Sequence, residues 1–149
     1  MNETVIKNAE AVLAKLTRFE HGCLECCVLA QIGEDGFPTA ATISPSKIDG
    51  IRHVYFCSGL GSNWVKRARQ NSRASVCFNS EEAQYNITLV GDITVVTDLG
   101  MKKEMWYDGM GGYYTGPEDP NFCVLKFTTT RYSLMISEFD ANGQARGEL

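Results

Sequence analysis

The chain begins with apolar side chains that recur every three or four positions: Val5, Ile6, Ala9, Val12, Leu13 and Leu16. This spacing places them on one face of a helix and predicts a helix over residues 3–16, with Asn2 as its N-cap. His21 and Gly22 then interrupt the pattern. An amphipathic helix is therefore expected at the N-terminal end of the sequence, before the other elements.

From residue 24 onward the apolar positions come in short runs bounded by turn residues, a pattern that is typical of strands. Asp35-Gly36 separates the first two runs and is a strong hairpin signal, and Asp49-Gly50 marks the next turn. The expected strands cover residues 24–32, 38–47, 52–58, 73–79, 84–97, 122–130 and 132–139. Two short helices, at 62–71 and 99–108, and a Gly- and Tyr-rich loop at 109–120 complete the pattern.

The links between these runs are mostly short, which favours antiparallel pairing. About seven strands with few helices predict a closed or nearly closed barrel rather than a doubly wound sheet. No internal repeat, low-complexity tract or linker interrupts the sequence, so residues 1–149 are expected to form a single domain.

Composition narrows the class of protein. The net charge of -4 argues against nucleic-acid binding by the chain as a whole. No apolar run approaches the roughly 20 residues that span a bilayer, and the N-terminus lacks a signal pattern, so we expect a cytoplasmic protein without a membrane segment. In that compartment the six cysteines are expected to be thiols.

The segment that carries chemistry is the turn after the strand at 52–58. Ser58 ends that strand, glycines flank the turn, and Ser62 is positioned to cap a helix whose first N–H groups lack partners. These groups and the helix dipole favour an anion, commonly a phosphate. Residues 52–73 also contain five basic side chains and no acidic one. An ordinary capped helix with a solvated face would give the same pattern, so both interpretations stay open here.

Other candidate groups give weaker signals. Cys23-x-x-Cys26 resembles half of a zinc site, but a structural zinc needs four ligands. The only other obvious candidate ligands are His21 and His53. No metal site is therefore predicted. The sequence has no Walker or dinucleotide-binding glycine signature. The aromatic residues Trp106, Tyr107, Tyr113 and Tyr114 suit a core, a dimer contact or a flat wall for a conjugated ring.

Several motifs, in this order and spacing, resemble the pyridoxamine 5'-phosphate oxidase-like flavoproteins over residues 5 to 139. The motifs are Asp35-Gly36-Phe37-Pro38, Phe56-x-Ser58-x-x-x-Ser62, Asn71, 74–78, 87–91, 96–98, Lys102-Lys103-x-x-x-Trp106 and Asp119-Pro120-x-x-Cys123-Val124-Leu125-Lys126-Phe127. The sequence looks closest to a short bacterial branch related to the general stress proteins. The resemblance implies a mainly β (α+β) fold, namely an antiparallel split β-barrel of six to seven strands with Greek-key character and a few peripheral short helices.

The resemblance also implies a homodimer that holds FMN at the subunit interface and exchanges electrons with a small-molecule donor and acceptor. The hydroxyls after the third strand would hold the phosphate, the second strand would lie along the isoalloxazine ring, and the partner subunit would contribute Trp106. Carried over residue by residue, the cofactor-binding set is Ala41, Thr42, Ile43, Ser44, Ser58, Gly59, Ser62, Asn63, Trp64, Lys66 and Trp106.

Two positions depart from the family pattern. Many members carry Arg where this chain has Ala41, and Lys where it has Trp64. Lys66 or Arg67 would then supply the missing charge, or Trp64 would stack on the flavin. The C-terminal tail offers only Arg146 for a pyridoxal-type substrate, so oxidation of pyridoxamine phosphate itself is not expected.

Three functions remain open from the sequence. The first is an FMN-dependent oxidoreductase, for which the protein would mainly position the flavin. The second is a flavin-binding module without turnover, related to stress. The third is a binder of haem, with His21 or His53 as axial ligand, or of a deazaflavin cofactor.

Overall fold

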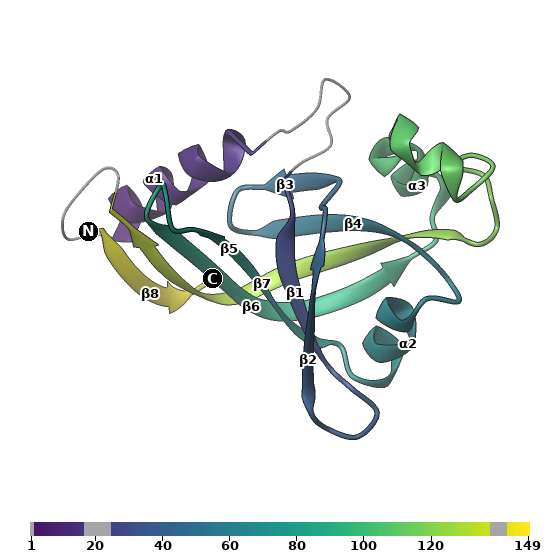
Figure 1. Ribbon diagram of the computed structural model, residues 1–149, viewed down its shortest axis with the longest axis horizontal. Helices are drawn as coiled ribbons and strands as arrows, with labels where there is room; N and C mark the ends of the chain where they lie inside the picture. Colours follow the sequence, from purple (N-terminus) through teal and green to yellow (C-terminus); the bar gives the residue numbers. More distant parts are fainter. Residues whose placement is uncertain (1, 17–24, 138–142) are drawn as a thin grey trace.

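The computed structural model describes residues 2–16, 25–137 and 143–149. One sheet dominates the described residues, and its strands pair in the order β2-β1-β5-β6-β7-β4-β3, with β8 on the free end of β7 (Figure 1). All pairs are antiparallel. Its strands are β1 (Cys27–Ile32), β2 (Pro38–Ile43), β3 (Lys47–Asp49), β4 (His53–Gly59), β5 (Arg73–Ser80), β6 (Tyr85–Val96), β7 (Phe122–Ile136) and β8 (Gln144–Glu148).

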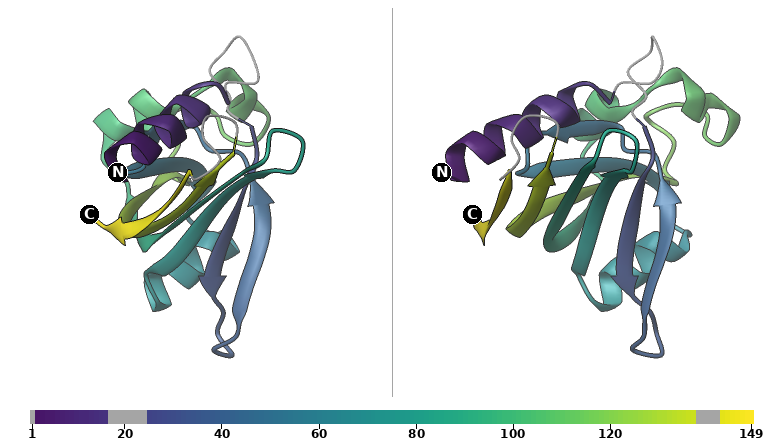
Figure 2. Two further views of the ribbon diagram at one scale, coloured as in Figure 1. Left: turned by 90° about the vertical axis from the view of Figure 1, so that its left-hand side faces the viewer. Right: turned by 60° about the vertical axis from the view of Figure 1, so that its left-hand side comes forward.

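The described residues include four helical segments around this sheet: α1 (Asn2–Ala14), α2 (Asn63–Gln70), α3 (Leu99–Met105) and the 3-10 turn η1 (Asp108–Gly112). In Figure 2, α1 lies across one side of the sheet and the β1–β2 hairpin projects away from the rest. Between the edge strands β2 and β3 no ladder forms in the described residues, so the barrel is split rather than closed.

The structure confirms the split antiparallel barrel, with eight strands in place of six to seven. The expected strand at 38–47 is two strands, β2 and β3, because the chain leaves the ladder at Ser44. The two expected closing strands are one continuous strand, β7, and the last strand is β8. Asn2 lies within α1 rather than before it, and its side-chain amide donates to the Tyr132 hydroxyl and the Arg146 carbonyl.

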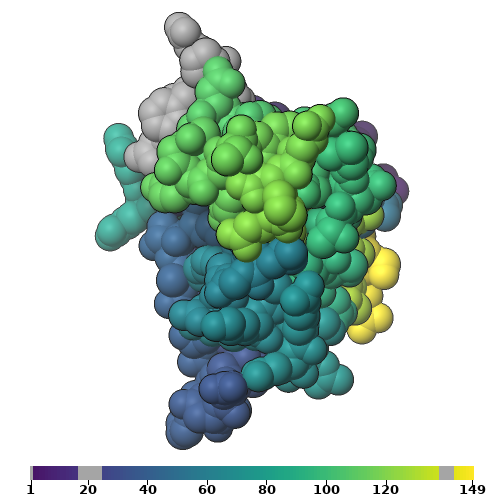
Figure 3. Space-filling model, turned by 90° about the vertical axis from the view of Figure 1, so that its right-hand side faces the viewer, coloured from purple at the N-terminus to yellow at the C-terminus, as the bar shows by residue number. Residues whose placement is uncertain are grey.

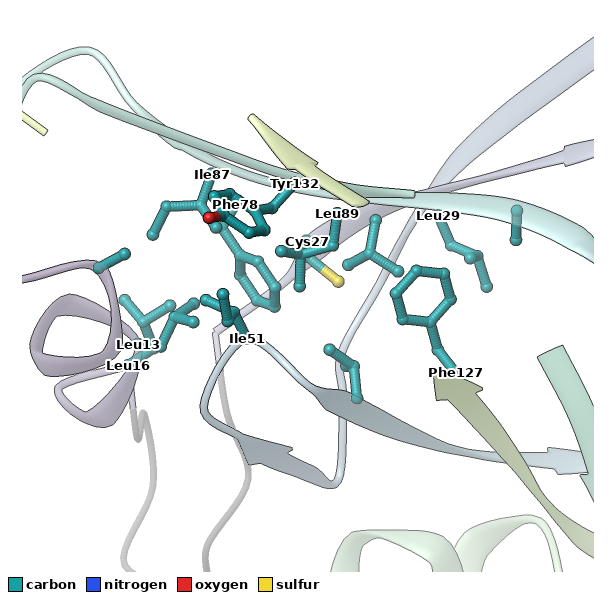
Figure 4. Packing of buried hydrophobic residues seen from close by; sticks show 14 of the residues in the cluster. Leu13, Leu16, Cys27, Leu29, Ile51, Phe78, Ile87, Leu89, Phe127 and Tyr132 are labelled. Carbon is teal, nitrogen blue, oxygen red and sulfur yellow. The ribbon is translucent and has the colours of Figure 1, made fainter. Parts of the chain in front are cut away.

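The main core lies between α1 and the concave side of the sheet. Phe78, Leu89 and Phe127 are buried there together with Leu13 of α1 (Figure 4). A bulge at Val90 and Gly91 bends β6 where it pairs with β7. A side chain at Gly91 would overlap the Thr128 carbonyl oxygen, so the close approach of these strands requires glycine there.

A second, smaller cluster lies on the opposite side of the sheet. Tyr55 and Val124, from the paired strands β4 and β7, pack against Met105 at the end of α3. The helix α3 therefore covers the outer side of the sheet at β4 and β7. This packing fixes the segment after α3 next to the end of β4 where Ser58 lies.

Candidate functional site

The turn after β4 is set by pairing with β7. Ser58 pairs with Cys123 and Gly59 pairs with Phe122, and the Leu60 amide then donates to the Asn121 carbonyl over 2.8 Å. The Ser62 amide closes the turn by donating to the Gly59 carbonyl at 2.9 Å. Strand pairing therefore determines where α2 begins.

Ser62 is the N-cap of α2, as the sequence predicts. Its backbone is extended, with φ -71 and ψ 157, and its hydroxyl accepts from the Val65 amide at 3.2 Å. The first helical hydrogen bond runs from the Lys66 amide to the Ser62 carbonyl. The amides of Asn63 and Trp64 precede that bond and point out of the helix end, where the dipole is positive.

The hydroxyls of Ser58 and Ser62 lie 2.8 Å apart and share a hydrogen bond. Ser58 is buried at 6% exposure, whereas Ser62 is half-buried. Two hydroxyls have two protons, and their mutual bond uses one of them. Whichever hydroxyl donates in that bond, the proton of the other remains, and a ligand oxygen can accept it. The pair suits an anion at the start of α2.

Trp64 and Arg67 form a stacked pair on α2. The Arg67 guanidinium carbon lies 5.5 Å from the centre of the Trp64 ring. The Trp64 carbonyl accepts from the Gln31 side-chain amide at 3.0 Å, and Gln31 is almost fully buried. The contact between Trp64 and Arg67 places a guanidinium on α2, and stacking of Trp64 on a flavin stays a prediction.

The strand β2 carries the proposed ring-binding residues Ala41, Thr42, Ile43 and Ser44. Ala41 and Thr42 are exposed, and Ile43 is half-buried against the main core. Successive residues point to opposite faces, so Ala41 shares a face with Thr39, which lines the groove beside α2. Ser44 follows the strand, and its hydroxyl lies 3.1 Å from the Cys26 sulfur.

An aromatic group lies on the other side of the Ser58 turn. Trp106 packs edge to face on Phe122, with ring centres 5.1 Å apart, and Tyr114 packs on the same ring at 5.3 Å. A Cβ on Gly59 would lie 2.9 Å from the Tyr114 hydroxyl. Burial raises the pKa of the Tyr114 phenol, so this hydroxyl stays protonated at neutral pH.

The sequence places Tyr114 in an aromatic cluster without indicating its contact with Gly59, and it does not single out Gln31, although both lie against the site. The signal for Tyr114 would have been the register between β4 and β7, which places Gly59 opposite Phe122. Gln31 would have been found as a polar residue among the inward positions of β1, where Cys27 and Leu29 are buried. The contact of Tyr114 requires knowledge of strand pairing, whereas Gln31 requires the inward face of β1.

Some candidate residues lie elsewhere. His53 is at the opposite end of β4 from Ser58, and its Nδ1 lies 3.3 Å from the Thr128 hydroxyl. His21 and Cys23 lie outside the described residues. Residues 2–16, 25–137 and 143–149 hold no group of three potential metal ligands among His, Cys, Asp and Glu. They also include no helix long and apolar enough to cross a membrane.

The described residues form a split antiparallel barrel in which a pair of hydroxyls lies at the N-terminus of α2. The family model for "Pyridoxamine 5'-phosphate oxidase like" proteins matches residues 21–133. The chain therefore belongs to the pyridoxamine 5'-phosphate oxidase-like family. No curated protein matches the sequence.

Solved structures agree with the fold. A Clostridium acetobutylicum protein related to general stress protein 26 of Bacillus subtilis has a TM-score of 0.75 and 21% identity, covering 100% of this chain and 96% of that one. General stress protein 26 from Bacillus anthracis has a TM-score of 0.72 and 16% identity, covering 94% and 98%. A pyridoxamine 5'-phosphate oxidase-related, FMN-binding protein from Nostoc punctiforme has a TM-score of 0.63 and 16% identity, covering 97% and 87%.

Proposed function

We propose that this protein is an FMN-dependent oxidoreductase that works as a homodimer in the cytoplasm. The observation that carries the proposal is the hydrogen-bonded pair of Ser58 and Ser62 at the N-terminus of α2. A spare hydroxyl proton, two helix-end amides and the nearby Arg67 fit a phosphate monoester in number and in charge. Bound FMN would supply the hydride and electron chemistry.

In this proposal the protein's residues bind and orient the cofactor. Ser58, Ser62 and the amides of Asn63 and Trp64 hold the phosphate, with Lys66 close by on the same helix. Arg67, held over Trp64, supplies the cation that family members carry at the positions of Ala41 and Trp64. Because Arg67 lies one turn farther along the helix, we expect weaker FMN binding than in members with both basic residues.

The proposed dimer interface is the outer face of β1, β5 and β6. Val28, exposed at 41%, pairs with Cys77, which in turn pairs with Thr88. The same face continues through small or apolar side chains: Ala30, Thr42, Ser75 and Val90. No helix of the described residues covers this part of the sheet, whereas α3 covers it at β4 and β7. In this proposal a second copy of the chain packs on this outer face. The dimer would bring the partner subunit's Trp106 to the flavin.

A binding module without turnover is the second candidate. In the described part of the chain, the hydrogen bonds of the Ser58–Ser62 pair involve no carboxylate or histidine, an arrangement that suits either hydride transfer or storage. Reduction of the bound flavin by a nicotinamide nucleotide, followed by reoxidation with an acceptor, separates the two. Oxidation of pyridoxamine phosphate is not part of the proposal, because Arg146 is the only cation on β8.

The test is the absorbance spectrum of the purified protein after loading with FMN and gel filtration. We expect flavin bands near one FMN per chain at the elution volume of a dimer. Ser62→Asp keeps a good helix cap but places a negative charge at the site, so it should fold normally and lose FMN. Asp98→Ser, a cap exchange on α3, is the matched control and should retain FMN.

Two outcomes would contradict the proposal. A wild-type protein that elutes without flavin would show that the Ser58–Ser62 turn does not bind FMN. Equal FMN retention by Ser62→Asp and Asp98→Ser would show that FMN binds somewhere else. A Soret band in place of the flavin bands would favour haem.

A further inference from the structure

A groove of about 590 Å³ lies beside the proposed phosphate site, between the β1–β2 turn and α2. Asn63 and Lys66 border it on the helix side, within one turn of Ser62. Thr39 borders it on β2, two residues before Ala41. The groove therefore begins one residue after Ser62. Figure 3 shows this surface, with α2 between the projecting hairpin and the segment that contains α3.

Opposite charges face each other across this groove. Lys66 and Arg67 lie on the helix side, and Glu34 and Asp35 lie on the turn. These four side chains form no ion pair with one another in the described part of the chain. Oppositely charged groups that line one groove but stay apart leave room for a ligand that offers both an anion and hydrogen-bond donors.

The carboxylates on the turn are held in place. One Glu34 oxygen accepts from the Gln70 side chain at 3.3 Å, and one Asp35 oxygen accepts from the Phe37 amide at 3.1 Å. The second oxygen of each makes no hydrogen bond within the described residues, so both remain available as acceptors. Phe37, at the end of the same turn, exposes 71% of its surface.

We propose that this groove binds the nucleoside 5'-phosphate half of a dinucleotide. Lys66 would bind the phosphate of this half, while Arg67 stays with the flavin phosphate. Glu34 and Asp35 would accept from the ribose hydroxyls, and Phe37 would offer a flat apolar surface to the base. A bare phosphate fits poorly, because the two carboxylates repel its negative charge. The proposal rests on the proposed function, since the other half of the dinucleotide would lie at the flavin site.

Two dinucleotides share this chemistry. One is FAD, whose flavin half would occupy the proposed FMN site. The other is a nicotinamide adenine dinucleotide that serves as electron donor, with its nicotinamide on the bound flavin. In both, the adenylate half is the part that lies in the groove.

The first experiment titrates AMP, adenosine and inorganic phosphate into the FMN-loaded protein by calorimetry. We expect AMP to bind more tightly than adenosine or phosphate. The double variant Glu34→Gln/Asp35→Asn should weaken AMP binding about tenfold, because it removes charge-assisted hydrogen bonds, and FMN retention should be unchanged. Glu81→Gln/Glu82→Gln is the matched control, with the same charge change in the turn at the opposite end of β5 from α2.

The second experiment identifies the source. On the flavin-free protein, the dissociation constants of FAD and FMN are compared. On the FMN-loaded protein, the KM values of NADH and reduced nicotinamide mononucleotide are compared. In one of the two comparisons the dinucleotide should bind more tightly than its mononucleotide. Glu34→Gln/Asp35→Asn should lose this advantage, whereas Glu81→Gln/Glu82→Gln should keep it. AMP binding without an advantage in either comparison would overturn the proposal, as would absent AMP binding or equal AMP binding by both double variants. A protein that retains no FMN would instead refute the proposed function.

Discussion

The hydroxyls of Ser58 and Ser62 are 2.8 Å apart, and Ser62 also caps α2 by accepting from the Val65 amide. One side chain therefore joins the end of β4 to the start of α2. Loss of this hydroxyl removes both the cap and the partner of a buried serine. The geometry of the proposed phosphate site and the stability of α2 are coupled through this residue.

Ser62→Ala should lower the free energy of unfolding by about 1–2 kcal/mol, because an N-cap is lost and the buried Ser58 hydroxyl loses its partner. Asp98→Ala removes the equivalent cap of α3, where the carboxylate accepts from the Met101 amide at 3.0 Å. Since Asp98 is exposed, the cost there should be about 1 kcal/mol or less. Urea unfolding of both variants measures this, and a smaller loss for Ser62→Ala than for Asp98→Ala would contradict the coupling.

Gly59→Ala should destabilise the protein through contact with Tyr114. The added Cβ would lie 2.9 Å from the Tyr114 hydroxyl and 3.2 Å from the Asn121 side-chain nitrogen, so these groups must move. We expect a loss of about 1–3 kcal/mol, the range for overpacking. Tyr114→Phe removes the nearest atom, so Gly59→Ala should cost less in that background. Thermal unfolding of the two single variants and the double variant measures the coupling, and strictly additive effects would argue against it.

Much of the fold follows from local patterns in the sequence. The helical spacing of Val5, Ala9 and Leu13 predicts α1, and Asp35-Gly36 predicts the β1–β2 hairpin. Ser62 is the cap of α2 as expected. These features depend on neighbours in sequence, which is why the pattern of residues is enough to find them.

The features missed by the sequence depend on long-range pairing. The continuity of β7 past Thr130 arises because β6 and β8 pair with it on both sides. The contact of Tyr114 with Gly59 and the bond from Gln31 to Trp64 join segments 55 and 33 residues apart, respectively. No local rule indicates which distant strands pair, so this part of the site becomes visible only in the fold.

The thiols of two buried cysteines, Cys27 and Cys123, are expected to be unreactive in the folded protein. Burial raises the pKa of the Cys27 thiol to about 12 and that of Cys123 to about 11. Both thiols are therefore protonated in the folded state at pH 8, with roughly one thiolate in a thousand at Cys123. We expect neither to react with iodoacetamide in the native protein, and both to react in guanidinium. Peptide mass mapping after labelling measures this, and native labelling of either residue would contradict its burial.

The raised pKa values of Cys27 and Cys123 also determine the direction in which stability changes with pH. Unfolded thiols ionise near their ordinary pKa of 9.0, whereas the folded thiols stay protonated until pH 11 or higher. Between these values the folded state binds more protons, so stability is complete below pH 9 and falls as the pH rises. Unfolding midpoints in urea should therefore decrease from pH 8.5 to 10.5. In Cys27→Ala/Cys123→Ala the decrease should be shallower, and an unchanged slope would assign it to other groups.

Two adjacent lysines of α3 have different environments and should differ in their effect on stability. Lys102 is buried at 6% exposure, and its amino group donates to the Asp119 carbonyl at 2.9 Å and lies 5.9 Å from the centre of the Phe122 ring. Lys103 is exposed and forms a 3.8 Å ion pair with Glu118, whose side chain is also exposed. The first lysine therefore ties the segment before β7 to the helix, whereas the second is surrounded by solvent.

Lys102→Ala should lower the free energy of unfolding by about 1–3 kcal/mol, because it removes a charge-assisted hydrogen bond and the packing of a long side chain. Lys103→Ala should cost less than about 0.5 kcal/mol, as is usual for a solvent-exposed ion pair. Both variants change the net charge equally, so the comparison isolates the environment. If urea unfolding gave the two variants equal stabilities, the Lys102–Asp119 contact would not contribute to the stability of the fold.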